Sequence, residues 1–151
     1  TPKPSSAASD VYKRQPKAGS PYQYFDSLLA LAEWSDVLVC AAPGGASTHH
    51  VINAAALQAL GAEGFLVNVG RGSIVDTPAL ASALAAGVIA GAGIDVYESE
   101  PKPPAELIGL DNLILTPHLA GWSPESIDAQ FTIFLENIEG HFSGRGAVTP
   151  V

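Results

Sequence analysis

The feature that most constrains the fold is an alternation, from residue 16 onward, of short apolar runs with longer segments of helical period. Four runs are almost continuously apolar, namely residues 36–42, 64–69, 89–96 and 112–116. Strands that alternate with helices are typical of a parallel α/β sheet. The continuous apolarity of these runs further predicts strands that are covered on both faces.

Helices are predicted over residues 25–34, 49–60, 77–86 and 124–141. Asp, Ser or Pro stands at the start of most of these segments and Gly near the end, which are the usual boundary signals of helices. The last segment is the longest, and Ser123 is its expected N-cap. Its apolar residues recur on one helical face, which predicts that this face packs against another element.

A doubly wound nucleotide-binding sheet normally opens with a strand, a G-x-G-x-x-G turn and a helix, and this turn is missing. Gly91-Ala92-Gly93 lies inside a strand pattern, so we interpret it as room for close packing and not as a phosphate cradle. The sequence therefore predicts an α/β fold with a partial doubly wound, Rossmann-type parallel sheet whose first βαβ half is missing. The chain also contains no methionine, and we expect it to be a carboxyl-terminal piece of a longer protein.

Composition excludes several classes of partner. A formal net charge of −8 leaves no positive field for nucleic acid or for an anionic membrane. No apolar run reaches the roughly 18 residues of a membrane span. The single cysteine, Cys40, permits no internal disulfide and favours a reducing compartment, so we expect a cytoplasmic protein.

The first fifteen residues differ from the rest of the chain. Residues 5–15 (SSAASDVYKRQ) are polar and unpatterned, and their back-translation resembles a widely used transposase sequencing adaptor. We therefore interpret residues 1–15 as a non-native leader, and residues 16–151 as the carboxyl-terminal part of a nucleotide-binding domain with a final helix and tail. The alternative is a natural disordered leader.

Polar residues that could carry chemistry stand at or after the ends of three of the predicted strands, namely Arg71, Asp95 with Glu100, and His118. Ligands of open α/β sheets bind outside the carboxyl ends of the strands, so these side chains are expected at one rim. An arginine there suits an anionic substrate group, although it could instead pair with Asp76 or bind a carbonyl. A histidine beside a carboxylate is suited to proton transfer near neutral pH.

Two further features of the rim loops have competing interpretations. Gly70 and Gly72 flank the arginine, and we expect them to allow a ligand close to the backbone. His49 and His50 are adjacent, and the sequence shows no Cys or acidic residue that completes a metal set with them. We therefore expect no metal site.

Three segments together resemble the D-isomer-specific 2-hydroxyacid dehydrogenases. Residues 67–76 (VNVGRGSIVD), 91–101 (GAGIDVYESEP) and 115–121 (LTPHLAG) are similar to the arginine, glutamate and histidine motifs of that family. The resemblance runs from about residue 22 to the end of the chain. Residues 24–28 and 141–144 make the glyoxylate/hydroxypyruvate reductase group the nearest.

The resemblance implies a catalytic set in which Arg71 holds the substrate carboxylate, His118 transfers the proton and Glu100 supports His118. It implies NAD or NADP as cofactor, a short 2-oxo or 2-hydroxy acid as substrate, and a homodimeric parent protein. The 151 residues alone are then expected to be inactive. The cofactor-binding residues that it implies are Ala41, Ala42, Pro43, Val69, Gly70, Arg71, Asp95, His118 and Gly121. A corepressor-like dinucleotide-binding protein shares the fold and the same three residues, and it remains the alternative.

Overall fold

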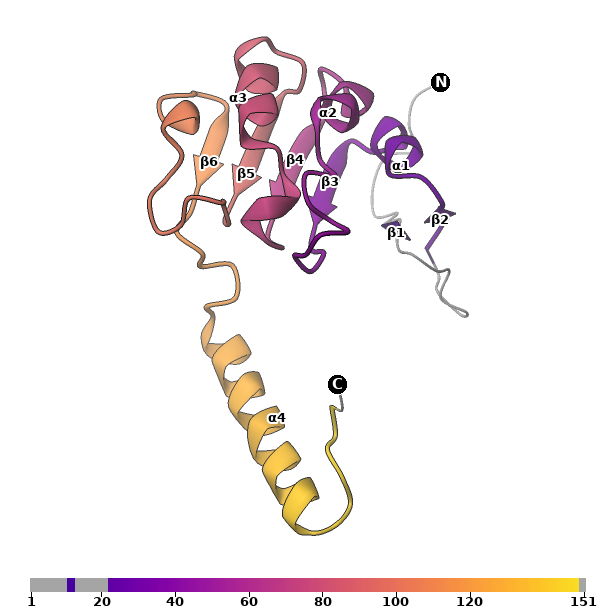
Figure 1. Ribbon diagram of the computed structural model, residues 1–151, viewed down its shortest axis with the longest axis vertical. Coiled ribbons are helices and arrows are strands. Elements are labelled where there is room, and N and C mark those ends of the chain that lie inside the picture. Colours follow the sequence, from indigo (N-terminus) through magenta and orange to yellow (C-terminus); the bar gives the residue numbers. More distant parts are fainter. Residues whose placement is uncertain (1–10, 13–21, 150–151) are drawn as a thin grey trace. The chain divides into compact units, whose positions relative to one another are not determined.

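The computed structural model describes residues 11–12 and 22–149, and the chain divides into two compact units between Pro117 and His118 (Figure 1). The first contains a four-stranded sheet with its helices, and the second contains one long helix. A two-residue strand, β1 (Val11–Tyr12), pairs in parallel with β2 (Tyr24–Phe25). The rest of the predicted leader lies outside the described residues, and its adaptor origin stays a prediction.

The main sheet has the order β3-β4-β5-β6 and is parallel throughout, as predicted. Its strands are β3 (Val37–Cys40), β4 (Phe65–Asn68), β5 (Gly91–Ile94) and β6 (Leu113–Leu115), and each lies inside one of the predicted apolar runs. Because the strands are parallel, their carboxyl ends lie at one rim, and the strand order places successive loops side by side. The residues after each strand are therefore neighbours in space.

Helices α1 (Leu28–Trp34), α2 (Ala54–Leu60) and α3 (Thr77–Ala85) lie side by side on one face of this sheet (Figure 1). They bury the strand residues that point toward them, and Leu38, Leu66 and Ile94 are almost inaccessible to water. This layer forms the core of the first unit. Two short 3₁₀ turns, η1 (Gly72–Ile74) and η2 (Ala105–Leu107), complete it.

The opposite face of the sheet corrects the expectation that both faces are covered. Val39 is 59% exposed and Ile114 is 70% exposed, and both belong to the row of side chains that points away from the helices. Parallel crossovers are right-handed, so a sheet wound in one direction places all its connecting helices on one side. The described residues hold one winding direction, which fits a partial doubly wound fold.

Two predicted helices begin later than expected, and local hydrogen bonds explain both differences. Residues 24–25 belong to β2, and Ser27 Oγ accepts from Ala30 N at 3.4 Å, so α1 begins at Leu28. The segment 49–53 is extended or turned, because Ile52 bridges Val75 in the neighbouring loop. The side chain of Asn53 then caps α2 by accepting from Ala55 N at 3.0 Å and Ala56 N at 3.2 Å.

The second unit contains α4 (Pro124–Phe142). Ser123 caps it as predicted, since its Oγ accepts from Ser126 N at 3.1 Å. Its predicted apolar stripe is exposed, with Phe131, Phe134 and Leu135 each more than half accessible. None of the helices in the described part of the chain has the length and apolar character to cross a bilayer.

Cys40 offers a chemical test of the first unit. It is the last residue of β3 and is buried, and this burial raises the pKa of its thiol, while a backbone hydrogen bond with Ala42 partly opposes the shift. Because the thiolate is the reactive form, we expect a disulfide reagent to modify native Cys40 at least about tenfold more slowly than Cys40 in the urea-unfolded chain. Equal rates in the two states would show that the helical layer does not cover β3.

Candidate functional site

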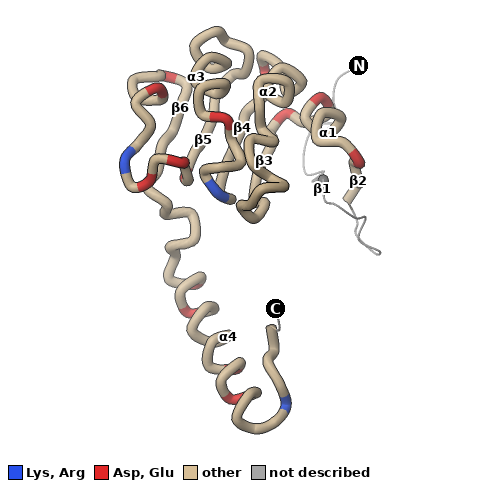
Figure 2. Tube along the Cα trace, in the orientation of Figure 1, with Lys and Arg blue, Asp and Glu red and all other residues tan. Residues whose placement is uncertain are grey.

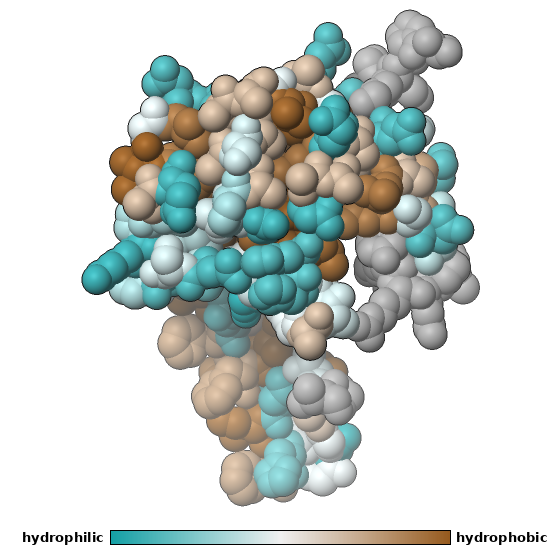
Figure 3. Space-filling model, turned by 45° about the horizontal axis from the view of Figure 1, so that its top comes forward, coloured by the Kyte–Doolittle hydropathy of each residue, from teal (hydrophilic) through white to brown (hydrophobic). Residues whose placement is uncertain are grey.

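The loops that follow the strands form a polar rim at the carboxyl end of the sheet. Figure 3 shows hydrophilic residues gathered in a band along the lower edge of the first unit. Lys and Arg are sparse in the described chain (Figure 2), and Arg71 is the sole one between residues 22 and 101. Among the Lys and Arg residues of this part of the chain, Arg71 is therefore the one that can meet an anionic ligand at the rim.

Asn68 builds the turn that presents Arg71. It ends β4 and is fully buried, and its Nδ2 donates to the carbonyl of Arg71 at 3.1 Å, while its Oδ1 accepts from Gly70 N at 3.1 Å. One side chain thus satisfies two backbone groups of a turn that leaves the sheet. Sequence reasoning missed this residue, although a buried amide within an apolar run was a visible signal.

Arg71 itself is exposed at the rim, and its Nη1 donates to the carbonyl of Gly70 at 2.7 Å. One of the alternatives considered for Arg71, that it binds a backbone carbonyl, is therefore present in the structure. Asp76, the other partner considered for Arg71, has a different role. Its Oδ1 accepts from Ala79 N at 3.0 Å and caps α3. The stem of Arg71 passes close to Gly44, where an added Cβ would lie 3.0 Å from Arg71 Cγ.

The structure explains why glycine stands on both sides of Arg71, and the explanation differs from the expected approach of a ligand. A Cβ on Gly70 would lie 2.6 Å from the carbonyl oxygen of Ala42, and a Cβ on Gly72 would overlap the backbone between Tyr97 and Glu98. Both positions lack room for a side chain because three rim loops touch there. Close packing of neighbouring backbone explains these glycines without any ligand.

The loop after β5 holds the two predicted carboxylates. Asp95 is 5% exposed, and its Oδ1 accepts from the hydroxyl of Thr116 at 2.5 Å, which ties the end of β5 to the end of β6. Glu100 is exposed, and its Oε1 accepts from Tyr97 N at 3.0 Å. The structure therefore places Arg71, Asp95 and Glu100 on neighbouring loops of one rim.

His118 is the first residue of the second unit and is exposed. Its φ of 56° is unusual for a residue other than glycine, and such backbone conformations are common at functional sites. Glu100 belongs to the first unit and His118 to the second, and the expected partnership of the two stays a prediction. The same holds for Gly121, which also lies in the second unit.

The remaining cofactor-binding candidates lie at the rim of the first unit. Ala41, Ala42 and Pro43 directly follow β3, and Val69 follows β4 with its amide donating to the carbonyl of Cys40 at 2.9 Å. Gly91, by contrast, lies within β5, where an added Cβ would meet the ring of Phe65 and the carbonyl of Asn112. This contact confirms the packing interpretation for Gly91, whereas a Cβ on Gly93 would meet only Val67 Cγ2, at 4.0 Å.

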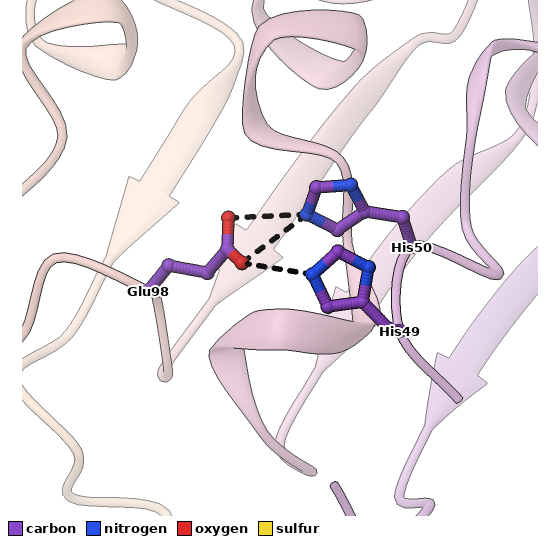
Figure 4. A group of neighbouring side chains, drawn as sticks. All are labelled: His49, His50 and Glu98. Atoms are coloured by element: carbon purple, nitrogen blue, oxygen red, sulfur yellow. Dashed lines mark hydrogen bonds and ion pairs between the residues drawn. The ribbon is translucent and has the colours of Figure 1, made fainter. Parts of the chain in front are cut away.

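His49 and His50 lie beside an acidic residue that the sequence pattern did not reveal. The Nε2 of His50 lies 3.2 Å from both carboxylate oxygens of Glu98, and the Nε2 of His49 lies 3.8 Å from Oε1 (Figure 4). The expectation that no acidic residue completes a set with the two histidines is therefore wrong. Glu98 is distant in sequence, and only the parallel strand order brings its loop to the histidines.

Removing the side-chain amide of Asn68 tests its role in the Arg71 turn. We expect Asn68→Ala to lower the free energy of unfolding by about 1–3 kcal/mol, because it removes the acceptor of the buried Gly70 N–H and one of the donors to the carbonyl of Arg71. Urea denaturation of the chain measures this change. Gln58→Ala, at an exposed position of α2, is the matched control and should change the stability by less than about 0.5 kcal/mol. A similar loss in both variants would remove Asn68 from this role.

Comparisons with known proteins agree with the three motifs. Residues 5–120 match the family model described as the D-isomer specific 2-hydroxyacid dehydrogenase, NAD binding domain. The chain is 44% identical over 138 residues to a glyoxylate/hydroxypyruvate reductase of Arabidopsis thaliana, which covers 91% of this chain and 43% of the relative. It is 46% identical over 126 residues to a glyoxylate reductase of Pyrococcus horikoshii, which covers 83% of this chain and 37% of the relative.

A solved structure shows the same fold. It is an NADPH-dependent glyoxylate/hydroxypyruvate reductase from Sinorhizobium meliloti in complex with NADP and malonate, with a TM-score of 0.84 and 42% identity over 95% of this chain and 45% of that one. The chain thus spans less than half the length of the relatives that it matches. The matched family model covers the whole main sheet and all but the last residue of the three motifs, so this chain belongs to the D-isomer-specific 2-hydroxyacid dehydrogenase family.

Proposed function

We propose that the protein that contains this chain reduces a short 2-oxo acid, of the glyoxylate or hydroxypyruvate type, to the D-2-hydroxy acid with NADH or NADPH. The observation that carries this proposal is the exposed Arg71 at the carboxyl rim, on a turn that the buried Asn68 holds in place. A guanidinium suits the planar carboxylate of a 2-oxo acid, which it can bind through two parallel hydrogen bonds. The relatives named above, which are reductases of such acids, support this choice of substrate.

The first unit has groups that fit part of a nicotinamide dinucleotide. Ala41–Pro43 and the exposed Val69 offer small apolar side chains at the rim. Asp95, at the end of β5, adds a carboxylate that Thr116 holds in place. Reduced nicotinamide supplies a hydride to the substrate carbonyl carbon. Residues 41–43 would border the adenosine side, and Val69, Gly70 and Asp95 the nicotinamide side. Gly121, which belongs to the second unit, is proposed for the nicotinamide side as well. The choice between NAD and NADP stays open in this proposal.

His118 is assigned the proton. In reduction, the protonated imidazole donates its N–H proton to the substrate's carbonyl oxygen as that oxygen gains negative charge, and in oxidation the neutral ring takes the proton back. A carboxylate beside the ring favours its charged form, which is the role proposed for Glu100. Arg71 keeps the carboxylate and the carbonyl in place during the transfer.

The remaining parts of the proposal concern the whole protein. We propose a homodimer in the cytoplasm that binds neither nucleic acid nor membranes, on the basis of the acidic charge and the family. The 151 residues alone are expected to lack activity, since the described chain has no glycine-rich phosphate cradle. The relatives reported above give no support to the corepressor-like alternative.

The decisive assay follows the oxidation of NADPH and of NADH by the complete protein in the presence of glyoxylate, hydroxypyruvate and phenylpyruvate. The proposal predicts turnover with at least one of the first two acids, and a D-configured product by chiral chromatography. A folded protein that binds NADPH and oxidises it with none of the three acids would contradict the enzymatic proposal and favour a dinucleotide-sensing role.

A further inference from the structure

We propose that His49, His50 and Glu98 form a binding site for one divalent transition-metal ion of the zinc class, which joins the loop after β3 to the loop after β5. The ligand atoms of the three residues lie within 4.8 Å of one another. The two histidines come from one loop and the carboxylate from another (Figure 4). Neither Arg71, Glu100 nor His118 belongs to this set, so the site is separate from the residues assigned to hydride and proton transfer.

The distances between the ligand atoms suit a tetrahedral ion. Zinc binds imidazole nitrogen and carboxylate oxygen at about 2.0–2.2 Å, so two ligand atoms of a tetrahedral site lie about 3.3 Å apart. The Nε2 of His50 lies 3.2 Å from each oxygen of Glu98, and the Nε2 of His49 lies 3.8 Å from Oε1. Small side-chain rotations are enough to aim all three atoms at one ion.

The backbone holds these side chains in place before any ion binds. His50 has a φ of 51°, and its N–H donates to the carbonyl of Ser73 at 2.8 Å, which fixes an otherwise unfavourable conformation. The hydroxyl of Thr48 donates to the carbonyl of Pro43 at 2.8 Å and braces the same loop. On the other side, the backbone at Glu98 packs so tightly on Gly72 that no Cβ fits between them.

The stacking of the two histidines favours a metal over a simple ion pair. Their ring centroids lie 3.9 Å apart with 27° between the planes, and both Nε2 atoms face the same carboxylate. A stacked pair with both Nε2 atoms on one side can present two imidazole nitrogens to a single ion. An exposed ion pair of one histidine with Glu98 would add little stability.

The donor set determines which ion is expected. Two imidazoles and one carboxylate suit Zn²⁺, Co²⁺ or Ni²⁺, while Mg²⁺ and Ca²⁺ prefer oxygen ligands throughout. The side chains of His49 and Glu98 are 56% and 38% exposed, so water can complete the coordination. We therefore expect one ion per chain with three protein ligands and an open position.

Titration of the 151-residue chain with Zn²⁺ in a calorimeter, and with Co²⁺ by visible absorption, tests the site. We expect one equivalent of Zn²⁺ to bind with a dissociation constant below about 100 μM, and Co²⁺ to give the intense absorption of a tetrahedral complex. Zn²⁺ should also raise the melting temperature of the chain, because an ion that binds only the folded state stabilises it. Mg²⁺ at the same concentration should do neither.

Matched variants decide whether these three residues are the ligands. Glu98→Gln and His49→Ala should each weaken Zn²⁺ binding by at least about tenfold, and His50→Asn, which tolerates the positive φ, should do the same. The controls Glu106→Gln and His141→Ala alter exposed residues of the same types and should leave binding unchanged. Circular dichroism of each variant confirms that it is folded.

Two results would overturn the proposal. One is a wild-type dissociation constant weaker than about 1 mM while the chain is folded. The other is Zn²⁺ binding that the Glu98 and His49 variants leave intact, which would place the ion elsewhere.

Discussion

The variant His118→Ala of the complete protein is expected to lose about two to four orders of magnitude in kcat for the reduction of hydroxypyruvate or glyoxylate. The reason is that a positioned general acid contributes about that factor when it supplies a proton to a carbonyl oxygen in the transition state. Without it, the oxygen must take its proton from water as the hydride arrives. Stopped-flow or steady-state oxidation of NADPH measures the loss.

A second histidine provides the control for this experiment. His141 is exposed near the end of α4, in the same unit as His118, and His141→Ala should keep kcat within about twofold of the wild type. If His118→Ala turns over within tenfold of the wild type, His118 does not donate the proton. In that case the positive φ of His118 has a structural explanation only.

The variant Arg71→Ala is expected to lower kcat/KM by at least about a hundredfold. Hydrogen bonds to charged groups contribute about 1.5–3 kcal/mol each, and the proposed carboxylate would lose two of them. Arg71→Lys should recover part of this loss, because it restores the charge without the planar pair of donors. The same assay measures both variants over a range of substrate concentrations.

Two further readouts separate substrate binding from a role in folding. Arg71 is exposed, and its hydrogen bond to the carbonyl of the neighbouring Gly70 is local, so Arg71→Ala should change the free energy of unfolding by less than about 1 kcal/mol. Arg145→Ala is the matched control, since Arg145 lies in the second unit and pairs with Glu139 at 2.9 Å. A full loss of activity in the Arg145 variant, or none in the Arg71 variant, would refute the assignment.

The sequence predicted the sheet better than the helix starts. All four strands of the main sheet lie within the predicted apolar runs, although the structure covers only one of the two faces that these apolar residues form. The start of α2 moved from residue 49 to Ala54 because Ile52 bridges the neighbouring loop at Val75. This contact is with a residue distant in sequence, and no local pattern records it.

Some features of the candidate site could likewise be predicted from the sequence, and others could not. The placement of Arg71, Asp95 and Glu100 on one rim could be predicted, since parallel strands in sequence order bring their carboxyl ends together. The role of Asn68 in the Arg71 turn could not, because it depends on two hydrogen bonds that form only when the strand is buried. The need for glycine at position 72 could not be predicted either, because it comes from the backbone of the loop after β5.

By itself the sequence determined the fold class, the family and the residues of the three motifs, because each is written in local patterns of apolarity and residue type. Only the tertiary structure decided that the helices of the first unit cover one face of the sheet, that backbone contacts explain Gly70 and Gly72, and that Glu98 joins His49 and His50. All three features are contacts between segments that lie far apart in the chain. Strand order and packing determine which segments touch, and no single segment of the sequence contains that information.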